Sequence, residues 1–137
     1  MAVAEASTGG LIAAELTRLP GSSAYFAGGL VAYDHHSKTG TLGIPIEVFD
    51  HVGSVSAEAC LAMASAARRL FQAGIGLAET GIAGPGGAVA GKPVGVSYAA
   101  VSSDTGDVVR ENNFTGDRDH NRKSAVEAAL LLLADHL

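Results

Sequence analysis

Ala4-Glu5-Ala6-Ser7-Thr8-Gly9-Gly10 is the stretch around which this sequence is organised. An apolar run leads into it, and residues 11–18 continue with a helical pattern. Glycines allow positive φ angles and a close approach of the backbone to a ligand. A helix N-terminus offers free N–H donors that suit anions. The stretch therefore predicts a strand-to-helix turn that presents Ser7, Thr8, Gly9 and Gly10 to a small ligand.

The composition favours one α/β domain that covers residues 1–137. Hydrophobic residues make up 47% of the chain, whereas charged residues make up 17% and aromatic residues 5%. A core of small aliphatic side chains is therefore expected, and the 18 glycines suit close contacts between helices and a sheet. The formal net charge is −5, and the nine basic residues are scattered, which argues against a nucleic-acid partner.

The remaining composition points to a cytoplasmic protein without a membrane partner. Cys60 is the single cysteine, so no internal disulfide can form and a reducing compartment fits. Its expected role is that of a small buried side chain. No leader peptide or membrane-spanning run is recognisable in the sequence.

Alternating strand and helix patterns predict the architecture. Strands are expected at residues 1–4, 28–33, 75–80, 94–102 and 108–114, and helices at residues 9–19, 46–51, 57–72 and 118–136. The first half indicates βαβ units, and the turn at residues 104–107 indicates a hairpin. These patterns predict a three-layer α/β/α fold with a mixed, mostly parallel sheet of about five strands.

Three groups of polar residues lie at the ends of predicted strands. Ser7 and Thr8 follow the first strand, Tyr33 ends the second with Lys38 close behind it, and Thr80 ends the third with Gly81 next to it. In a mainly parallel sheet, ligands bind at the carboxyl ends of the strands, and the loop that begins at Gly84 could cover them. A hydroxyl group beside a desolvated lysine suits nucleophilic catalysis. The same residues also suit plainer roles: a helix cap for Ser7 and Thr8, a core edge for Tyr33 and a surface position for Lys38.

Two further groups leave alternatives open. His35 and His36 lie near His51, but no convergent set of cysteines or carboxylates accompanies them, so no metal site is expected. Arg118 and Arg122 begin the last helix. Each could pair with a neighbouring aspartate, or one could bind a phosphate with its guanidinium fork.

Motifs that follow one another in a family's order cover nearly the whole chain. They are Ala4-Glu5-Ala6-Ser7-Thr8-Gly9-Gly10, Pro20-Gly21-Ser22-Ser23-Ala24-Tyr25-Phe26, Gly29-Leu30-Val31-Ala32-Tyr33 with Lys38, Leu42-Gly43-Ile44-Pro45, residues 53–56, Thr80-Gly81-Ile82-Ala83-Gly84-Pro85-Gly86-Gly87, Lys92-Pro93-Val94-Gly95 and Gly116-Asp117-Arg118. With this set the chain resembles the C-terminal domain of the competence/damage-inducible protein CinA and its stand-alone relatives, the nicotinamide-nucleotide amidohydrolases. The helix that usually precedes the family's first strand is missing from the sequence.

The resemblance implies an activity and a set of site residues. The implied reaction converts nicotinamide mononucleotide and water to nicotinic acid mononucleotide and ammonia, without a metal or organic cofactor. Lys38 would act as general base with help from Tyr33. Thr80, Gly81, Gly84 and the backbone N–H groups of Thr8, Gly9 and Gly10 would bind the amide or its oxyanion. Arg118 would face the phosphate. A homo-oligomer is compatible with the apolar final helix.

The sequence differs from the family pattern at the position of the nucleophile. The family pattern is Glu-Ser-x-Thr-Gly-Gly, and Ala6 occupies the place of its serine. Ser7 could serve instead and is the residue we assign to catalysis. Thr8 is the second possibility, although small misplacements of a reacting group are costly. The third is that amidase activity is lost and nucleotide or partner binding is retained.

Overall fold

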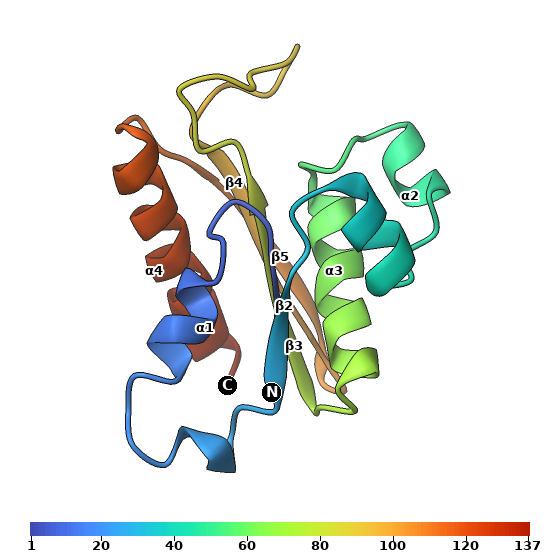
Figure 1. The fold of residues 1–137 in the computed structure, drawn as a ribbon, viewed down its shortest axis with the longest axis vertical. Coiled ribbons are helices and arrows are strands. Elements are labelled where there is room, and N and C mark those ends of the chain that lie inside the picture. Colours follow the sequence, from blue (N-terminus) through green and yellow to red (C-terminus); the bar gives the residue numbers. More distant parts are fainter.

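A five-stranded sheet forms the centre of the computed structural model, which describes residues 1–137 (Figure 1). Its strands are β1 (Ala2–Glu5), β2 (Gly28–Val31), β3 (Ile75–Gly81), β4 (Val96–Ser103) and β5 (Gly106–Asn113). The order across the sheet is β2-β1-β3-β4-β5. β1 pairs parallel with β2 and β3, whereas β4 pairs antiparallel with both β3 and β5. Only β4 runs against the others, so the prediction of a mixed, mostly parallel sheet is confirmed.

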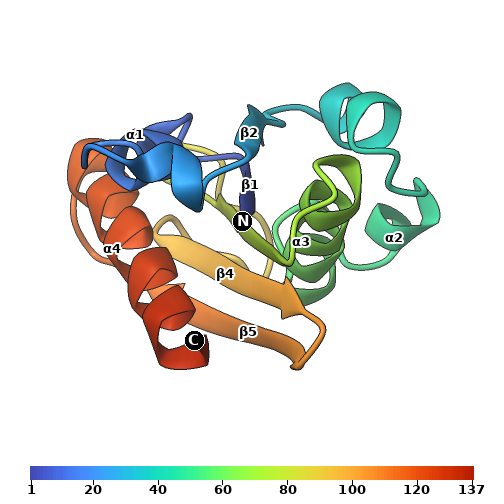
Figure 2. The same cartoon turned by 90° about the horizontal axis from the view of Figure 1, so that it is seen from below.

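Helices cover both faces of this sheet, as the three-layer prediction requires (Figures 1 and 2). α1 (Leu11–Leu16) and α4 (Arg118–His136) lie on one face. α2 (Glu47–Asp50) and α3 (Ala57–Leu70) lie on the other. Two short turns complete the chain: the 3-10 turn η1 (Ser22–Ala24) and the π-helical turn η2 (Ser37–Thr41), which contains Lys38.

Several predicted boundaries are wrong for identifiable reasons. The first helix ends at Leu16, not at residue 19, and the Thr17 hydroxyl donates to the Ala13 carbonyl at that end. The fourth strand begins at Val96, because Gly95 has a φ of +94°, which an extended strand does not allow. The second strand ends at Val31, so Tyr33 lies beyond it.

The two-residue period of the strands divides the core between the two helical layers. Ala2, Ala4 and Ala6 pack on the α3 side, whereas Val3 packs with α4 on the opposite side. Glu5 shares the face of Val3, and its register partner on β3 is Glu79. The fold therefore places two carboxyl groups side by side beneath α1.

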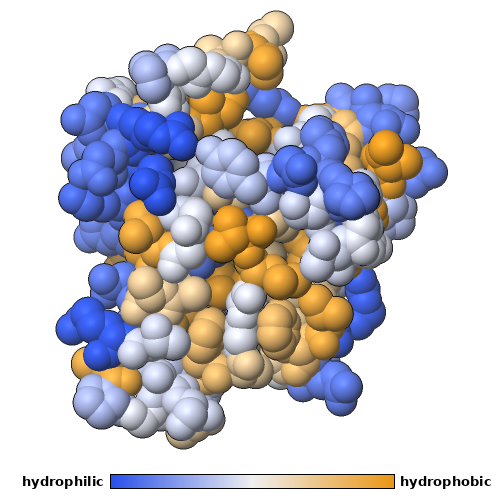
Figure 3. All heavy atoms as spheres, viewed as in Figure 1, coloured by the Kyte–Doolittle hydropathy of each residue, from blue (hydrophilic) through white to orange (hydrophobic).

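The edge of the sheet formed by β2 is partly apolar at the surface. Figure 3 shows hydrophobic residues gathered in the lower half of the view, on the side of the molecule where β2 lies. Val31 on β2 is 50% exposed, and Tyr25 and Leu19 are also exposed.

None of the helices combines the length and the hydrophobicity that a membrane span needs.

Candidate active site

The turn after β1 is held by a carboxylate from inside the protein. Gly9 and Gly10 have φ angles of +63° and +101°, which bring the chain from the strand into α1. The Glu5 carboxylate accepts hydrogen bonds from the N–H groups of Gly10 (2.9 Å), Ile12 (3.0 Å) and Ala13 (2.8 Å). The N-terminus of α1 is therefore satisfied by Glu5, which corrects the expectation that it offers free donors to a ligand.

Thr8 is fully buried behind this turn. Its hydroxyl lies 2.6 Å from Glu5 Oε2 and 2.9 Å from Glu79 Oε2, and its N–H donates to Glu79 Oε2 at 3.0 Å. Thr8, Gly9 and Gly10 do not line the cavity described next. The sequence prediction that these three residues contact the ligand is therefore not supported by their position.

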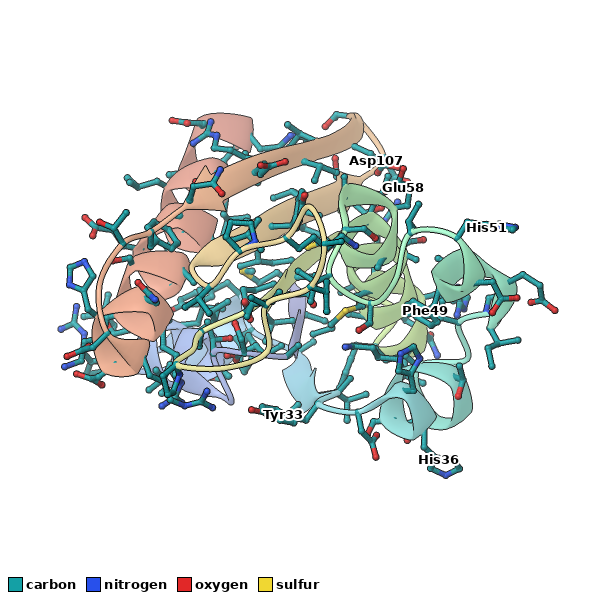
Figure 4. The ribbon with its side chains drawn as sticks, turned by 90° about the horizontal axis from the view of Figure 1, so that it is seen from above. Tyr33, His36, Phe49, His51, Glu58 and Asp107 are labelled. Atoms are coloured by element: carbon teal, nitrogen blue, oxygen red, sulfur yellow. The ribbon has the colours of Figure 1, made fainter.

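A polar cavity of about 250 Å³ lies at the carboxyl ends of β1, β2 and β3. Seven of the predicted residues line it: Ser7, Tyr33, Lys38, Thr80, Gly81, Gly84 and Arg118. The other lining residues are Ala6, Ser54, Val55, Ile82, Ala83, Gly86 and Gly87. Seen from above, Tyr33 points toward the loop that follows β3, whereas His36 and His51 point away from it (Figure 4). The topology thus brings together residues that are far apart in sequence.

Lys38 is the buried cation of this cavity. Its side chain lies in η2, the residue is 3% exposed, and the ion pairs of the molecule all involve other residues. Burial lowers the pKa of the Lys38 amine, and the charges of Glu79 and Asp34 oppose that shift. An amine with a lowered pKa is neutral, and able to accept a proton, at a lower pH than a surface lysine.

Ala6 and Ser7 lie at the cavity in different surroundings. Ala6 is buried in the core cluster on the α3 side, the side on which Thr80 also lies. The Ser7 hydroxyl donates a hydrogen bond to Glu79 Oε1, on the opposite side of the sheet. Of the adjacent hydroxyl groups of Ser7 and Thr8, only that of Ser7 belongs to a residue lining the cavity.

Glu79 is a buried carboxyl group that the sequence analysis missed. Burial raises its pKa, Glu5 adds to the shift, and the hydrogen bonds from Ser7 and Thr8 oppose it. The sequence holds one indication of this residue, because Glu79 is the only charged residue in the predicted strand at residues 75–80. Side chains of this kind are almost never fully buried without partners.

Thr80 and Tyr33 are held by neighbours around the cavity. The Thr80 hydroxyl donates to the Ser54 carbonyl at 2.8 Å, so its proton is already used and only its lone pairs face a ligand. Arg118 donates to the Tyr33 hydroxyl at 3.1 Å and to the Gly84 carbonyl at 2.7 Å. The backbone N–H groups of Ser7, Gly84 and Gly86 have no acceptor within the protein.

Two residues of α4 support the site from behind. Arg122 donates to the carbonyls of Ser7 at 3.0 Å and Thr8 at 2.9 Å. Buried Asn121 donates to the Ala83 carbonyl at 3.1 Å. The arginines do not pair with the neighbouring aspartates, because Asp117 caps α4 and Asp119 pairs with Lys123. Sequence alone could not reveal these supports, since their partners lie 38 to 115 positions away.

The other features considered do not form comparable sites. His35 and His36 are exposed, and the His35 ring packs edge-on against Phe49. Larger hollows of about 550 and 600 Å³ lie beside α1 and α4 and near the chain termini. Their lining is predominantly hydrophobic and lacks a buried titratable group, unlike that of the smaller polar cavity.

Comparisons with known proteins identify the family of this chain. The family model described as CinA C-terminal domain matches residues 1–137. A putative competence-damage inducible protein of Desulforamulus reducens is 48% identical over 130 residues, which cover 95% of this chain and 31% of that protein. One from Halothermothrix orenii is 44% identical over 138 residues, covering 100% of this chain and 33% of that protein. The chain thus spans about a third of the length of these relatives.

Solved structures share the fold. The competence/damage inducible protein CihA from Agrobacterium tumefaciens superposes with a TM-score of 0.94 at 38% identity, covering 98% of this chain and 82% of that one. A competence-damaged protein (CinA) superfamily protein from Escherichia coli gives a TM-score of 0.95 at 26% identity, with coverages of 99% and 79%. The chain belongs to the CinA C-terminal domain family.

Proposed function

We propose that this domain hydrolyses the carboxamide of nicotinamide mononucleotide, with Ser7 as nucleophile and Lys38 as general base. The observation that carries the proposal is the convergence of Ser7, Tyr33, Lys38, Thr80 and Arg118 on one cavity. The family resemblance supplies the substrate. The cavity of about 250 Å³ suits the nicotinamide end of the nucleotide, with the phosphate at the mouth beside Arg118.

The proposed reaction starts at the Ser7 hydroxyl. Its oxygen turns from Glu79 toward the substrate and forms a bond to the carboxamide carbon, while its proton passes to the neutral Lys38 amine. The free N–H groups of Ser7 and Gly84 are donors suited to the developing oxyanion, and the Thr80 hydroxyl oxygen can accept a substrate N–H. The carbon–nitrogen bond then breaks, and the Lys38 ammonium returns its proton to the leaving nitrogen, which departs as ammonia.

Hydrolysis of the acyl intermediate completes the cycle. A water molecule attacks the ester carbon and gives a proton to Lys38, and the carbon–Oγ bond breaks. The Ser7 oxygen recovers that proton from Lys38, and the nucleotide leaves as a carboxylic acid that loses its remaining proton to solvent. Each step uses only the residues that line the cavity and water.

A second candidate is nucleotide binding without turnover, and Ala6 is the observation that favours it. The Ala6 methyl group lies in the cavity wall on the side of α3, where the family pattern has a serine. The Ser7 hydroxyl, in contrast, is bound to Glu79. Under this candidate the purified domain binds the nucleotide but releases no ammonia, and Ala6→Ser confers activity.

Ammonia release from nicotinamide mononucleotide, measured beside binding by calorimetry, tests the two candidates. Turnover that Ser7→Ala and Lys38→Ala abolish supports hydrolysis by Ser7. Binding without release, followed by release from Ala6→Ser, supports the second candidate. No binding and no release from folded protein, including Ala6→Ser, rejects both.

A further inference from the structure

The carboxyl groups of Glu5 and Glu79 both lie within hydrogen-bond distance of the Thr8 hydroxyl, which has a single proton to donate. The two residues are register partners on adjacent parallel strands, and both are fully buried. The Thr8 hydroxyl lies within hydrogen-bond distance of both, at 2.6 Å from Glu5 Oε2 and 2.9 Å from Glu79 Oε2. A hydroxyl has one proton, so it can donate to only one of them. The second contact needs a proton on a carboxyl group.

The surroundings decide which carboxyl group keeps the negative charge. Glu5 accepts three backbone N–H groups at the start of α1, which stabilise an anion there. Glu79 accepts one N–H, from Thr8, and one hydroxyl, from Ser7. The extra proton therefore belongs on Glu79 Oε2, where it can be donated to the Thr8 oxygen while Thr8 donates onward to Glu5.

We propose that Glu79 is a positioning residue that carries a proton, shares it with Glu5 through the Thr8 hydroxyl, and holds the Ser7 hydroxyl at the cavity with its Oε1 oxygen. A neutral Glu79 binds Ser7 without competing for its proton as a base would. It also removes one of the two negative charges, those of Glu79 and Asp34, that favour the protonated Lys38 amine, and so favours the neutral amine. The link to catalysis rests on the proposed function, whereas the proton count does not.

The charged and titratable groups around Glu79 come from four elements. Glu5 lies on β1, Lys38 in η2 and Cys60 on α3, and Arg122 reaches the Ser7 and Thr8 carbonyls from α4. Burial raises the pKa of Glu79, in agreement with the proton count. Burial also raises the pKa of the Cys60 thiol above 9.0, so this group stays neutral between pH 5 and 8.

Carbon-13 NMR of the whole domain tests the proton directly. The Cδ resonances of Glu5 and Glu79 are assigned through their bonds to the backbone and followed from pH 5 to pH 8. The expected result is a protonated carboxyl shift for Glu79 at pH 5 that moves to the carboxylate value as the pH rises, with a midpoint above its ordinary pKa of 4.5. A carboxylate shift for Glu79 at pH 5, or a protonated Glu5, overturns the proposal.

The pH profile of stability gives a second readout, independent of substrate. A carboxyl group whose folded-state pKa is raised stabilises the fold fully below its unfolded pKa, and this contribution is lost as the pH rises through the folded pKa. The urea midpoint of the wild type should therefore fall between pH 5 and 8 more steeply than that of Glu79→Gln, which has no proton to lose. Exposed Glu127→Gln is the matched control and should keep the wild-type slope. Equal slopes for Glu79→Gln and the wild type overturn the proposal, whether or not ammonia release is seen.

Discussion

Arg118 at the start of α4 donates a hydrogen bond to the Tyr33 hydroxyl beyond the end of β2, at 3.1 Å. A second N–H of the same guanidinium donates to the Gly84 carbonyl at 2.7 Å. The fork of one arginine therefore ties together Tyr33 and Gly84, which lie on two walls of the cavity, and Arg118 itself is 85 positions from Tyr33 in the sequence. Lysine cannot reproduce this planar fork.

Arg118→Lys is expected to weaken nucleotide binding about tenfold or more, because a charged hydrogen bond contributes about 1.5–3 kcal/mol. Calorimetry with nicotinamide mononucleotide measures the effect, and the urea midpoint should change little. Arg110→Lys is the control, since Arg110 on β5 pairs with Asp135 on α4 and does not line the cavity. Equal affinities for both variants would contradict the role of Arg118 in the site.

Arg122 supports the turn rather than the ligand. Its side chain donates to two successive carbonyls of the turn, those of Ser7 and Thr8. Arg122→Ala leaves both carbonyls without these donors, and a loss of about 1.5–3 kcal/mol in the free energy of unfolding is expected. Urea denaturation measures this loss. Lys123→Ala, which removes an exposed pair with Asp119, should leave the midpoint unchanged. Equal midpoints for the two variants would show that Arg122 does not hold the turn.

The sequence predicts the secondary structure and topology of this molecule better than its buried polar contacts. Residues 118–136 are predicted as a helix and observed as α4, because a long apolar pattern follows the capping Asp117. The cavity residues Tyr33, Lys38 and Thr80 follow from strand ends in a parallel sheet and from the family motifs.

Neither the strand pattern nor the family motifs predict the role of Glu79. Its role depends on the register of β1 against β3, which places it opposite Glu5, and on the position of Thr8 between the two carboxyl groups. Register is a property of strand pairing that one chain's local pattern does not specify. For the same reason, Ser7 and Thr8 look equivalent in sequence, although one hydroxyl belongs to the cavity wall and the other is enclosed.

β3 lies close against the backbone of α3 at Gly76. A Cβ atom at this position would lie 2.0 Å from the Ala64 carbonyl oxygen. Because helix backbone cannot yield as a flexible side chain does, Gly76→Ala should cost about 3 kcal/mol or more in the free energy of unfolding. Gly74→Ala is the control, since its Cβ would meet nothing within 4 Å, and a change within about 0.5 kcal/mol is expected. Similar urea midpoints for the two variants would contradict this packing.

Lys38 should show opposite effects on stability and on turnover. Burial places its folded-state pKa below the unfolded value of 10.5, so the buried charge lowers stability while the amine is protonated. Stability from this group is regained as the pH rises from the folded pKa toward 10.5. Lys38→Met removes the charge and should raise the urea midpoint at pH 7, with a difference from the wild type that shrinks as the pH approaches 10.5.

The same substitution should lower ammonia release by about 100-fold or more, the usual contribution of a general base. In active protein, whether wild type or Ala6→Ser, the rate should rise with pH as the Lys38 amine loses its proton, with a midpoint below 10.5. Lys38→Arg keeps a charge that does not titrate in this range and should be inactive at every pH. A rate that does not depend on pH from 6 to 10, or an active Lys38→Arg, would remove Lys38 from the role of base, because only a neutral amine can accept the proton of the nucleophile.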